Sequence, residues 1–511
     1  MDLFFTSVAE SFKLCVDPLL MLLVLAGVFW GAIAGAMPGI GPNLAVGIML
    51  PVCFQLSPVY GITFLVAINV ACSFGNSIPA ILMGVPGTSS AVITAIDGYA
   101  LHKKGKSGLA LGVTFFSSVF GQFLSTFYFL AMVVPLAGLT YIFLTPELFA
   151  LYFLGVTAII SVTGTNLLKG LVASAFGLFL SLVGSDPINS VDRYIYHMEL
   201  YAGLQVVPVS MGLLAVSELF RSMRQSFSWD IDSKTVKAKF PSAKELWRVM
   251  PNIMVGTAIG TIVGAIPGTG GTASAVISYQ QSKLWSKHPE EYGKGSIEGV
   301  AANEAAQNAS QAGELVPTLG LGIPGSSTMV FLFGAMLMKG IVPGPQMLAK
   351  TPELLYACGA GCFAATFMLA IIGWPMSLSM LKLINLDRQL IFIGALGLCI
   401  VGVFSLNNSV FDVFLMLLFG MVGYFMRRYG YSVAGTSLAL ILGTGLESNL
   451  RGGLLLAGGW WHLLTRPWVM VILGVAFALL FYAAWGTIKM ARRDAAIRRR
   501  SIERARASAS N

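Results

Sequence analysis

Long apolar runs follow one another along most of the chain, from about residue 18 to about residue 485. A run of about 20 apolar residues can cross a bilayer as a single helix. The pattern therefore predicts an all-α polytopic membrane protein with roughly ten to fourteen membrane segments, some of them broken or re-entrant. Two stretches, residues 221–248 and 489–511, are polar enough to be aqueous.

The composition supports this fold class. Of the 511 residues, 56% are hydrophobic and 11% are charged, whereas soluble domains carry about 25% charged residues. So few charges cannot cover the surface of a soluble protein of this size. A water-soluble enzyme and a soluble domain on a single membrane anchor are therefore excluded.

The net charge of +9 is concentrated in two short stretches. Residues 489–511 contain eight basic and two acidic residues, and residues 221–248 contain seven basic and three acidic residues. Each stretch adjoins an apolar segment, which is typical of cytoplasmic loops under the positive-inside rule. We therefore predict a cytoplasmic linker and a cytoplasmic C-terminus beside the lipid bilayer, and no binding of nucleic acid.

Two motifs recur in the same order in both halves of the chain. Gly27–Val46 and Gly256–Ala275 share eight of twenty positions at an offset of 229, reading GVFWGAIAGAMPGIGPNLAV and GTAIGTIVGAIPGTGGTASA. Pro79–Ser90 and Pro317–Thr328 follow at an offset of 238, reading PAILMGVPGTSS and PTLGLGIPGSST. Such self-similarity indicates two homologous halves. The predicted boundaries are a first membrane repeat at 1–220, a linker at 221–248, a second membrane repeat at 249–488 and a tail at 489–511.

The loop charges indicate that the two halves have opposite orientations in the membrane. Three lysines occur at 102–106, whereas the counterpart at 340–351 has one. Conversely, three lysines occur at 283–294, and the counterpart at 55–60 has no charge. Inverted repeats are a transporter architecture, in which substrate and ions bind near the midplane between broken helices.

Each first motif joins a ladder of glycines to a helix break. The Gly-x3-Gly-x3-Gly ladder places its glycines on one helix face, where they allow close helix packing. The Pro-Gly-x-Gly that follows cannot continue a helix, and exposed backbone within a membrane must face protein or a watery cavity. Each second motif is also a helix break, and its hydroxyl side chains are well placed to begin a new helix.

Helix N-termini offer unpaired N–H groups and a partial positive charge, which suit a carboxylate. A single motif of this kind is more typical of a kink with an N-cap and no ligand. Four related breaks in a repeat favour a site that binds an anion with several carboxylates. The candidate substrate-binding residues are Pro38, Gly39, Gly41, Asn43, Pro86, Gly87, Thr88, Ser89, Ser90, Pro267, Gly268, Gly270, Thr272, Pro324, Gly325, Ser326, Ser327 and Thr328.

Polar residues between the two motifs are candidates for coupling ions, because a carboxylate within a membrane segment is costly and indicates function. Asn76, Asn303 and Glu304 are the predicted ion-coupling residues, for Na⁺ or H⁺, and Glu314 is a further candidate. The alternative is that this second-half stretch is a surface helix near the cytoplasm. The isolated Asp97 is better explained as a structural partner than as an ion ligand.

No arrangement typical of an enzyme is found in the sequence. The four histidines are scattered, and no HExxH, HxxxxD, DDxxD, CxxC or Walker motif occurs. We therefore predict no catalytic residue, no metal site and no cofactor. Energy for uphill transport would come from an ion gradient or from another subunit.

The paired GAMPGIG and GAIPGTG, with GVPGTSS and GIPGSST, resemble the large membrane subunit of tripartite tricarboxylate transporters, the TctA family. The resemblance extends over about Leu19–Trp485. It implies a bacterial inner membrane protein that takes up citrate and other carboxylates, driven by a cation gradient. It also implies two partners, a small four-helix membrane subunit (TctB-like) and a periplasmic substrate-binding protein (TctC-like). The four Gly/Pro motifs would line the carboxylate and ion sites, with asymmetric contacts because Asn43 has Thr272 at its equivalent position.

The chain is therefore predicted to be the large subunit of a binding-protein-dependent symporter for tricarboxylates or related carboxylates. A stand-alone ion-coupled carrier, exporter or channel for organic anions on the same fold is the first alternative. A membrane-embedded enzyme would need a catalytic constellation that the sequence lacks. A structural scaffold for another membrane protein would predict no transport defect when the motifs are mutated.

Overall fold

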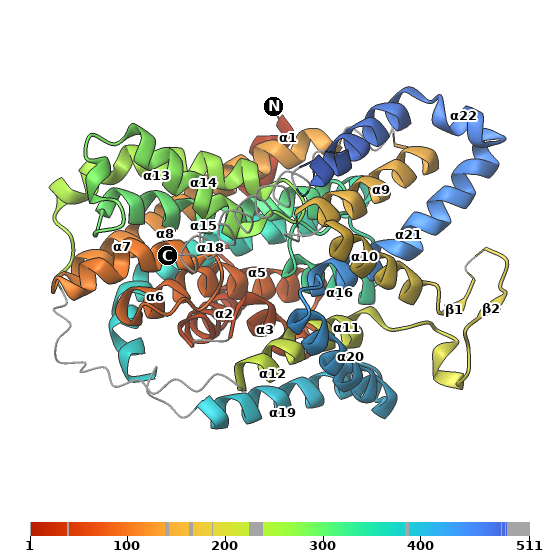
Figure 1. Cartoon of the computed structure of the whole chain (residues 1–511), viewed down its shortest axis with the longest axis horizontal. Coiled ribbons are helices and arrows are strands. Elements are labelled where there is room, and N and C mark those ends of the chain that lie inside the picture. Colours follow the sequence, from red (N-terminus) through yellow and green to blue (C-terminus); the bar gives the residue numbers. More distant parts are fainter. Residues whose placement is uncertain are drawn as a thin grey trace, which may run out of the picture.

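The computed structural model is almost entirely helical (Figure 1). Within the described part of the chain, only β1 (Gly184–Ser185) and β2 (Asp192–Arg193) pair as strands, in antiparallel register. The predicted all-α polytopic class is confirmed. The structure describes residues 2–37, 40–137, 143–162, 167–186, 188–223, 239–383, 388–481, 483–485 and 487.

The helical elements follow one another with short connections. In chain order they are α1 (Asp2–Leu14), α2 (Pro18–Ala36), α3 (Pro42–Ile48), α4 (Leu50–Gln55), α5 (Pro58–Gly75), α6 (Ser77–Met83), α7 (Ala91–Lys103), α8 (Ser107–Ala137), α9 (Thr145–Val162), α10 (Leu167–Ser181), η2 (Met198–Leu200), α11 (Val206–Ser210), the π-helical η3 (Met211–Val216), α12 (Ser217–Met223), α13 (Ala243–Gly264), α14 (Gly270–Trp285), η5 (Pro289–Glu291), α15 (Ile297–Gly320), α16 (Met329–Met338), α17 (Pro345–Lys350), α18 (Pro352–Leu383), α19 (Arg388–Asn407), α20 (Val410–Arg428), α21 (Val433–Ala457) and α22 (Trp460–Leu464).

Eight helices among the described residues are long and apolar enough to cross a membrane. Many of the long helices lie along the long axis of the molecule, and β1 and β2 project at one end (Figure 1). The eight segments are Pro18–Ala36, Pro58–Met83, Ser107–Leu136, Val206–Met223, Ala243–Gly264, Pro352–Met380, Val410–Arg428 and Pro467–Trp485. Three shorter apolar helices, at Leu167–Ser181, Met329–Met338 and Phe392–Asn407, accompany them.

The glycine ladders of the two halves pack in the same way, with α2 against α5 and α13 against α15. A Cβ on Gly31 would lie 2.3 Å from the carbonyl oxygen of Ile68, and a Cβ on Gly260 would lie 2.3 Å from that of Ala306. These glycines and carbonyls are related by the two offsets of the sequence repeat. The domain boundaries and the opposite orientation of the halves stay predictions.

Gly31→Val and Gly260→Val are expected to prevent stable folding, because a side chain at either position forces two packed backbones apart. The measurement is the yield of monodisperse protein by size-exclusion chromatography after detergent extraction. Gly394→Val is the matched control, since a Cβ at Gly394 meets no atom within 4 Å. Yields of the two ladder variants equal to that of the control would contradict the packing role.

All four motifs interrupt helices, as predicted. The first motifs separate α2 from α3 and α13 from α14, and the second motifs separate α6 from α7 and α15 from α16. Gly84 ends α6 with a φ of 67°; Gly268, before α14, and Gly270, the first residue of α14, have φ values of 83° and 59°. Glycine adopts this left-handed region without steric cost. The breaks therefore bring backbone that is not paired within helices into an otherwise apolar bundle.

α15 is a polar helix that lies inside the protein. Every residue of α15 except Glu298 is buried, and Glu304 and Glu314 are 0% and 2% exposed. The helix packs against α8, α13 and α14, and its many alanines allow these neighbours to come close. The alternative that this stretch is a surface helix is therefore wrong for Glu304.

Candidate functional site

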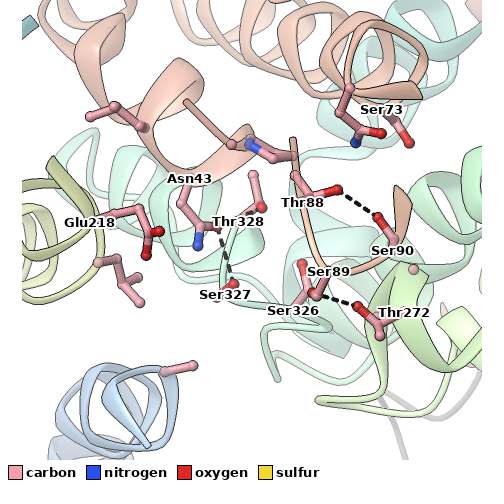
Figure 2. Close-up of a pocket in the computed structure, with 18 of the residues that line it drawn as sticks. Asn43, Ser73, Thr88, Ser89, Ser90, Glu218, Thr272, Ser326, Ser327 and Thr328 are labelled. Carbon is pink, nitrogen blue, oxygen red and sulfur yellow. Dashed lines mark hydrogen bonds between the residues drawn. The ribbon is translucent and has the colours of Figure 1, made fainter. Parts of the chain in front are cut away.

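The four helix breaks meet at one cavity of about 370 Å³, which residues of both halves line (Figure 2). Ser73 and Asn76 come from the end of α5, and Gln311 and Glu314 come from α15. The predicted binding residues in the cavity wall are Gly41, Asn43, Gly87, Thr88, Ser89, Ser90, Gly268, Gly270, Thr272, Ser326, Ser327 and Thr328. The motifs thus form one polar cavity, although equivalent motifs of the two halves lie 229 and 238 residues apart in the sequence.

Some of the predicted binding residues are not part of the cavity wall. Those among the described residues are Pro86, Pro267, Pro324 and Gly325. Gly325 packs against α15, because a Cβ at this position would lie 2.4 Å from the carbonyl oxygen of Glu314. The three prolines lie three or four residues after the ends of α6, α13 and α15, where they keep the chain from continuing as a helix, and Gly325 allows close approach. These residues therefore shape the cavity without lining it. Pro38 and Gly39 lie outside the described residues.

Each first motif contacts the second motif of the other half. Asn43 Oδ1 accepts hydrogen bonds from Ser327 Oγ at 3.1 Å and from Thr328 Oγ1 at 2.8 Å. Likewise, Thr272 Oγ1 of the second half lies 2.8 Å from Ser89 Oγ of the first half (Figure 2). Asn43 is equivalent to Thr272, and Ser327 to Ser89, so the repeat relates the two contacts. An amide in one contact and a hydroxyl in the other make them chemically asymmetric, as the sequence predicts.

The hydroxyl groups at the ends of the second motifs do not cap the helices that follow. Ser90 and Thr328 are the N-cap residues of α7 and α16, and neither side chain accepts a hydrogen bond from its own helix. Ser90 Oγ lies 2.9 Å from Thr88 Oγ1 instead, and Thr328 bonds to Asn43. A kink stabilised by N-caps would use these hydroxyls on its own backbone. Ser326 Oγ does accept a hydrogen bond from the amide of Met329, the first residue of α16, at 3.4 Å, so Ser90 and Thr328 are the hydroxyls that bond outside their own helices.

Glu314 is a buried acid in the cavity wall. Its Oε2 accepts a hydrogen bond from Ser326 Oγ at 2.5 Å, which joins α15 to the second motif that follows it. One turn earlier on α15, Gln311 Oε1 accepts from Asn69 Nδ2 of α5 at 2.5 Å. α5 and α15, which are equivalent helices of the two halves, thus contact each other next to the breaks.

Glu304 is a second buried acid, which lies beside the cavity and not in its wall. Its described side-chain partners are hydroxyl groups: Ser77 Oγ at 2.8 Å, Ser118 Oγ at 3.3 Å and Thr94 Oγ1. No Lys or Arg among the described residues forms an ion pair with Glu304. Burying a carboxylate without an ion-pair partner costs free energy, and a proton or a cation bound to the carboxylate would reduce this cost.

The other two predicted ion-coupling residues belong to the same network. Asn303 Nδ2 donates to Thr94 Oγ1 at 2.8 Å, and Thr94 in turn donates to Glu304. Asn76 Oδ1 accepts from Gln307 Nε2 at 2.9 Å. The structure therefore brings Asn76, Asn303 and Glu304 together at the interface of the two halves.

Several buried side-chain oxygens around this network have no hydrogen-bond partner among the described residues. They are Asn69 Oδ1, Ser73 Oγ, Asn303 Oδ1, Gln307 Oε1 and Asn308 Oδ1. Buried polar atoms are normally paired, so a group of unpaired oxygens needs a reason. Neutral oxygens beside one carboxylate are ligands that suit a hard cation.

Three charged residues of the cavity wall, Glu218, Arg221 and Arg427, are not among the site residues predicted from the sequence. Arg427 Nη1 lies 2.9 Å from Glu218 Oε2, and Arg221 Nη1 lies 3.8 Å from Glu218 Oε1. Arg221 was assigned to the basic linker, and the other two residues lie outside the repeated motifs. Arg427 ends an apolar run, as cytoplasmic loop arginines do, so the pattern alone cannot distinguish a cavity residue from a loop residue.

The sequence matches a known family over most of its length. The model of the Tripartite tricarboxylate transporter TctA family matches residues 21–438 of the chain, a segment that includes all four motifs. The chain belongs to the TctA family. The TctA family is a family of transporters, and the match confirms the resemblance drawn from the paired Gly/Pro motifs.

Two proteins of Agrobacterium vitis are similar to this TctA-family chain. One, named "Uncharacterized 52.8 kDa protein in TAR-I ttuC' 3'region", is 32% identical over 494 residues, which cover 96% of this chain and 98% of that protein. The other, named "Uncharacterized protein in TAR-II ttuC' 3'region", is 31% identical over 228 residues, which cover 44% of this chain and 94% of that protein. No solved structure matches the chain significantly.

Proposed function

We propose that this TctA-family chain is the large membrane subunit of a binding-protein-dependent transporter that imports citrate-like tricarboxylates or related carboxylates. The observation that supports this function best is that four helix breaks, two from each half, converge on one polar cavity. α7, α14 and α16 all begin at the cavity wall. Their N-termini carry partial positive charge and N–H groups, which suit the carboxylates of an anion.

We propose that the network of Asn76, Asn303 and Glu304 binds the coupling ion, either Na⁺ or H⁺. A cation here would neutralise the buried carboxylate and satisfy neighbouring unpaired oxygens. Glu304 and Glu314 lie on one helix, about 15 Å apart by helical rise. A change at Glu304 can therefore reach the cavity wall through a single rigid element, which is the simplest way to couple ion and substrate.

We propose that the chain lies in the bacterial inner membrane, with the linker and the C-terminus in the cytoplasm. Arg221, at the start of this linker, is an exposed residue of the cavity wall. The cavity would then be open toward the cytoplasm, in an inward-facing state. In the outward-facing state, the site would receive substrate from a periplasmic binding protein, with the small four-helix subunit as a second partner.

The proposal is tested by uptake of labelled citrate and a panel of di- and tricarboxylates in cells. The large subunit is expressed with both partners, with each partner alone, and by itself, in buffers with Na⁺ present or replaced. We expect uptake only when all three proteins are present and only with a cation gradient. Uptake by the large subunit alone would indicate a stand-alone carrier, and no uptake of any carboxylate would contradict the proposed substrate class.

A further inference from the structure

One wall of the cavity carries an ion pair that connects α12 to α20. Arg427 Nη1 lies 2.9 Å from Glu218 Oε2, and both side chains remain partly exposed, at 23% and 28%. Figure 2 shows the Glu218 carboxylate on the side of the cavity where Asn43 lies. A solute in the cavity can therefore reach the same ion pair that closes this wall.

The guanidinium of Arg427 is held in position by a serine hydroxyl and a backbone carbonyl. Its Nε donates to Ser217 Oγ at 3.0 Å, and its Nη2 donates to the carbonyl oxygen of Leu214 at 3.2 Å. Leu214 belongs to the π-helical η3, and π-helical segments interrupt regular helix bonding and are frequent at functional sites. Two of the three nitrogens thus fix the group, and Nη1 faces the Glu218 carboxylate.

Close packing fixes α20 against η3. A Cβ on Gly212 would lie 2.4 Å from the carbonyl oxygen of Met416, and a Cβ on Gly423 would lie 2.8 Å from that of Leu213. Backbone contacts this close leave little room for α20 to shift. Arg427, one turn after Gly423, is therefore presented to the cavity at a defined place.

The charges in the cavity wall leave few candidates to bind an anion with several carboxylates. Among the described lining residues, the cationic side chains are Arg221 and Arg427, and the acidic ones are Glu218 and Glu314. Arg221 is 55% exposed and 3.8 Å from Glu218, so its ion pair is weak. Arg427 is the better placed cation, because its Nη1 already faces a carboxylate and can make a charge-assisted hydrogen bond to the carboxylate of a substrate.

We propose that Arg427 binds one carboxylate of the transported anion, and that Glu218 occupies this guanidinium when the cavity is empty. The substrate carboxylate takes the place of the Glu218 carboxylate on Nη1, while the bonds to Ser217 and Leu214 keep the arginine in place. Glu218 is thus an internal competitor of the substrate, and Arg427 is a specificity-determining residue. This inference rests on the proposed function, because it takes a carboxylate as the substrate.

The test measures KM and maximal rate for citrate, or for the best carboxylate of the panel, in cells that contain the large subunit and both partners. Arg427→Gln is expected to raise KM by at least about tenfold, because a charge-assisted carboxylate contact is lost. Glu218→Gln is expected to lower KM by about threefold or more, because the competing carboxylate becomes neutral. Arg428→Gln is the matched control, since the neighbouring Arg428 is exposed and does not line the cavity.

Opposite shifts of KM in the two variants would support the proposal, since a purely structural ion pair would lower the amount of folded protein in both variants and leave KM unchanged. If Arg427→Gln does not accumulate in the membrane, the KM of Glu218→Gln decides. If the wild-type protein takes up a carboxylate and Glu218→Gln has the same KM as the wild type, this inference is overturned and the proposed function remains intact. A wild-type protein that takes up no carboxylate at all would overturn both.

Discussion

Gly268→Val is expected to abolish carboxylate uptake while the protein still accumulates in the membrane. Gly268 lines the cavity in the break between α13 and α14, with a φ of 83°. Its amide donates to the carbonyl oxygen of Gly325 at 2.8 Å, which ties the first motif of the second half to the second motif. A β-branched side chain here distorts the break, at a cost of about 1–3 kcal/mol, and fills space that the substrate needs.

The control for this variant has to carry the same backbone strain without touching the cavity. Gly458 meets this condition, since it ends α21 with a φ of 74° and a Cβ there meets no atom within 4 Å. Gly458→Val should therefore lose some stability and keep its uptake. Equal amounts of both variants in the membrane, with near-normal uptake by Gly268→Val, would remove this break from the substrate site.

Glu304→Gln is expected to weaken the dependence of uptake on Na⁺ or on pH. The amide keeps the size of the side chain and can still accept hydrogen bonds from Ser77 and Thr94, so the fold should persist. It removes the single negative charge that would hold a cation or a proton. We expect the cation concentration for half-maximal uptake to change by about tenfold or more, which corresponds to about 1.4 kcal/mol of lost binding.

Asp97→Asn is the matched control, because Asp97 is also an acid with 0% exposure. Its carboxylate accepts hydrogen bonds from the Tyr279 hydroxyl at 2.8 Å and from the amides of Gly293 and Gly295 at 2.8 and 2.7 Å. These bonds tie α7 to α14 and to the loop before α15, in agreement with the interpretation as a structural partner. Asp97→Asn should therefore lower stability and keep the cation dependence. Unchanged Na⁺ and pH dependence in Glu304→Gln would remove Glu304 from the ion site.

The helix breaks could be predicted from the sequence because helix breaking is a local property. Proline and glycine interrupt a helix wherever they stand, and their recurrence at two fixed offsets showed that the four breaks belong together. The pairing of Asn43 with Ser327 and of Thr272 with Ser89 needed the fold, because a repeat does not tell which motif of one half meets which motif of the other.

The burial of α15 inside the protein and the charged residues of the cavity wall could not be predicted from the sequence. A polar helix at a membrane surface and a polar helix buried by α8 and α13 have the same composition, so only packing distinguishes them. Glu218 and Arg427 lie 209 residues apart on elements that carry no repeated motif. Their ion pair exists because η3 and α20 approach at glycines, which is a property of the tertiary structure.

The most direct test of the central claim, that the breaks of both halves form one carboxylate site, is substrate protection of introduced thiols. Ser89→Cys and Thr272→Cys place one thiol in each half, at exposed positions of the cavity wall, and Thr465→Cys provides an exposed control away from it. The rate of modification by a hydrophilic maleimide is measured on detergent-purified protein, with citrate and other carboxylates present or absent. The account predicts that one and the same carboxylate slows modification at positions 89 and 272 and not at 465. Equal rates with and without every carboxylate at both cavity positions would contradict it.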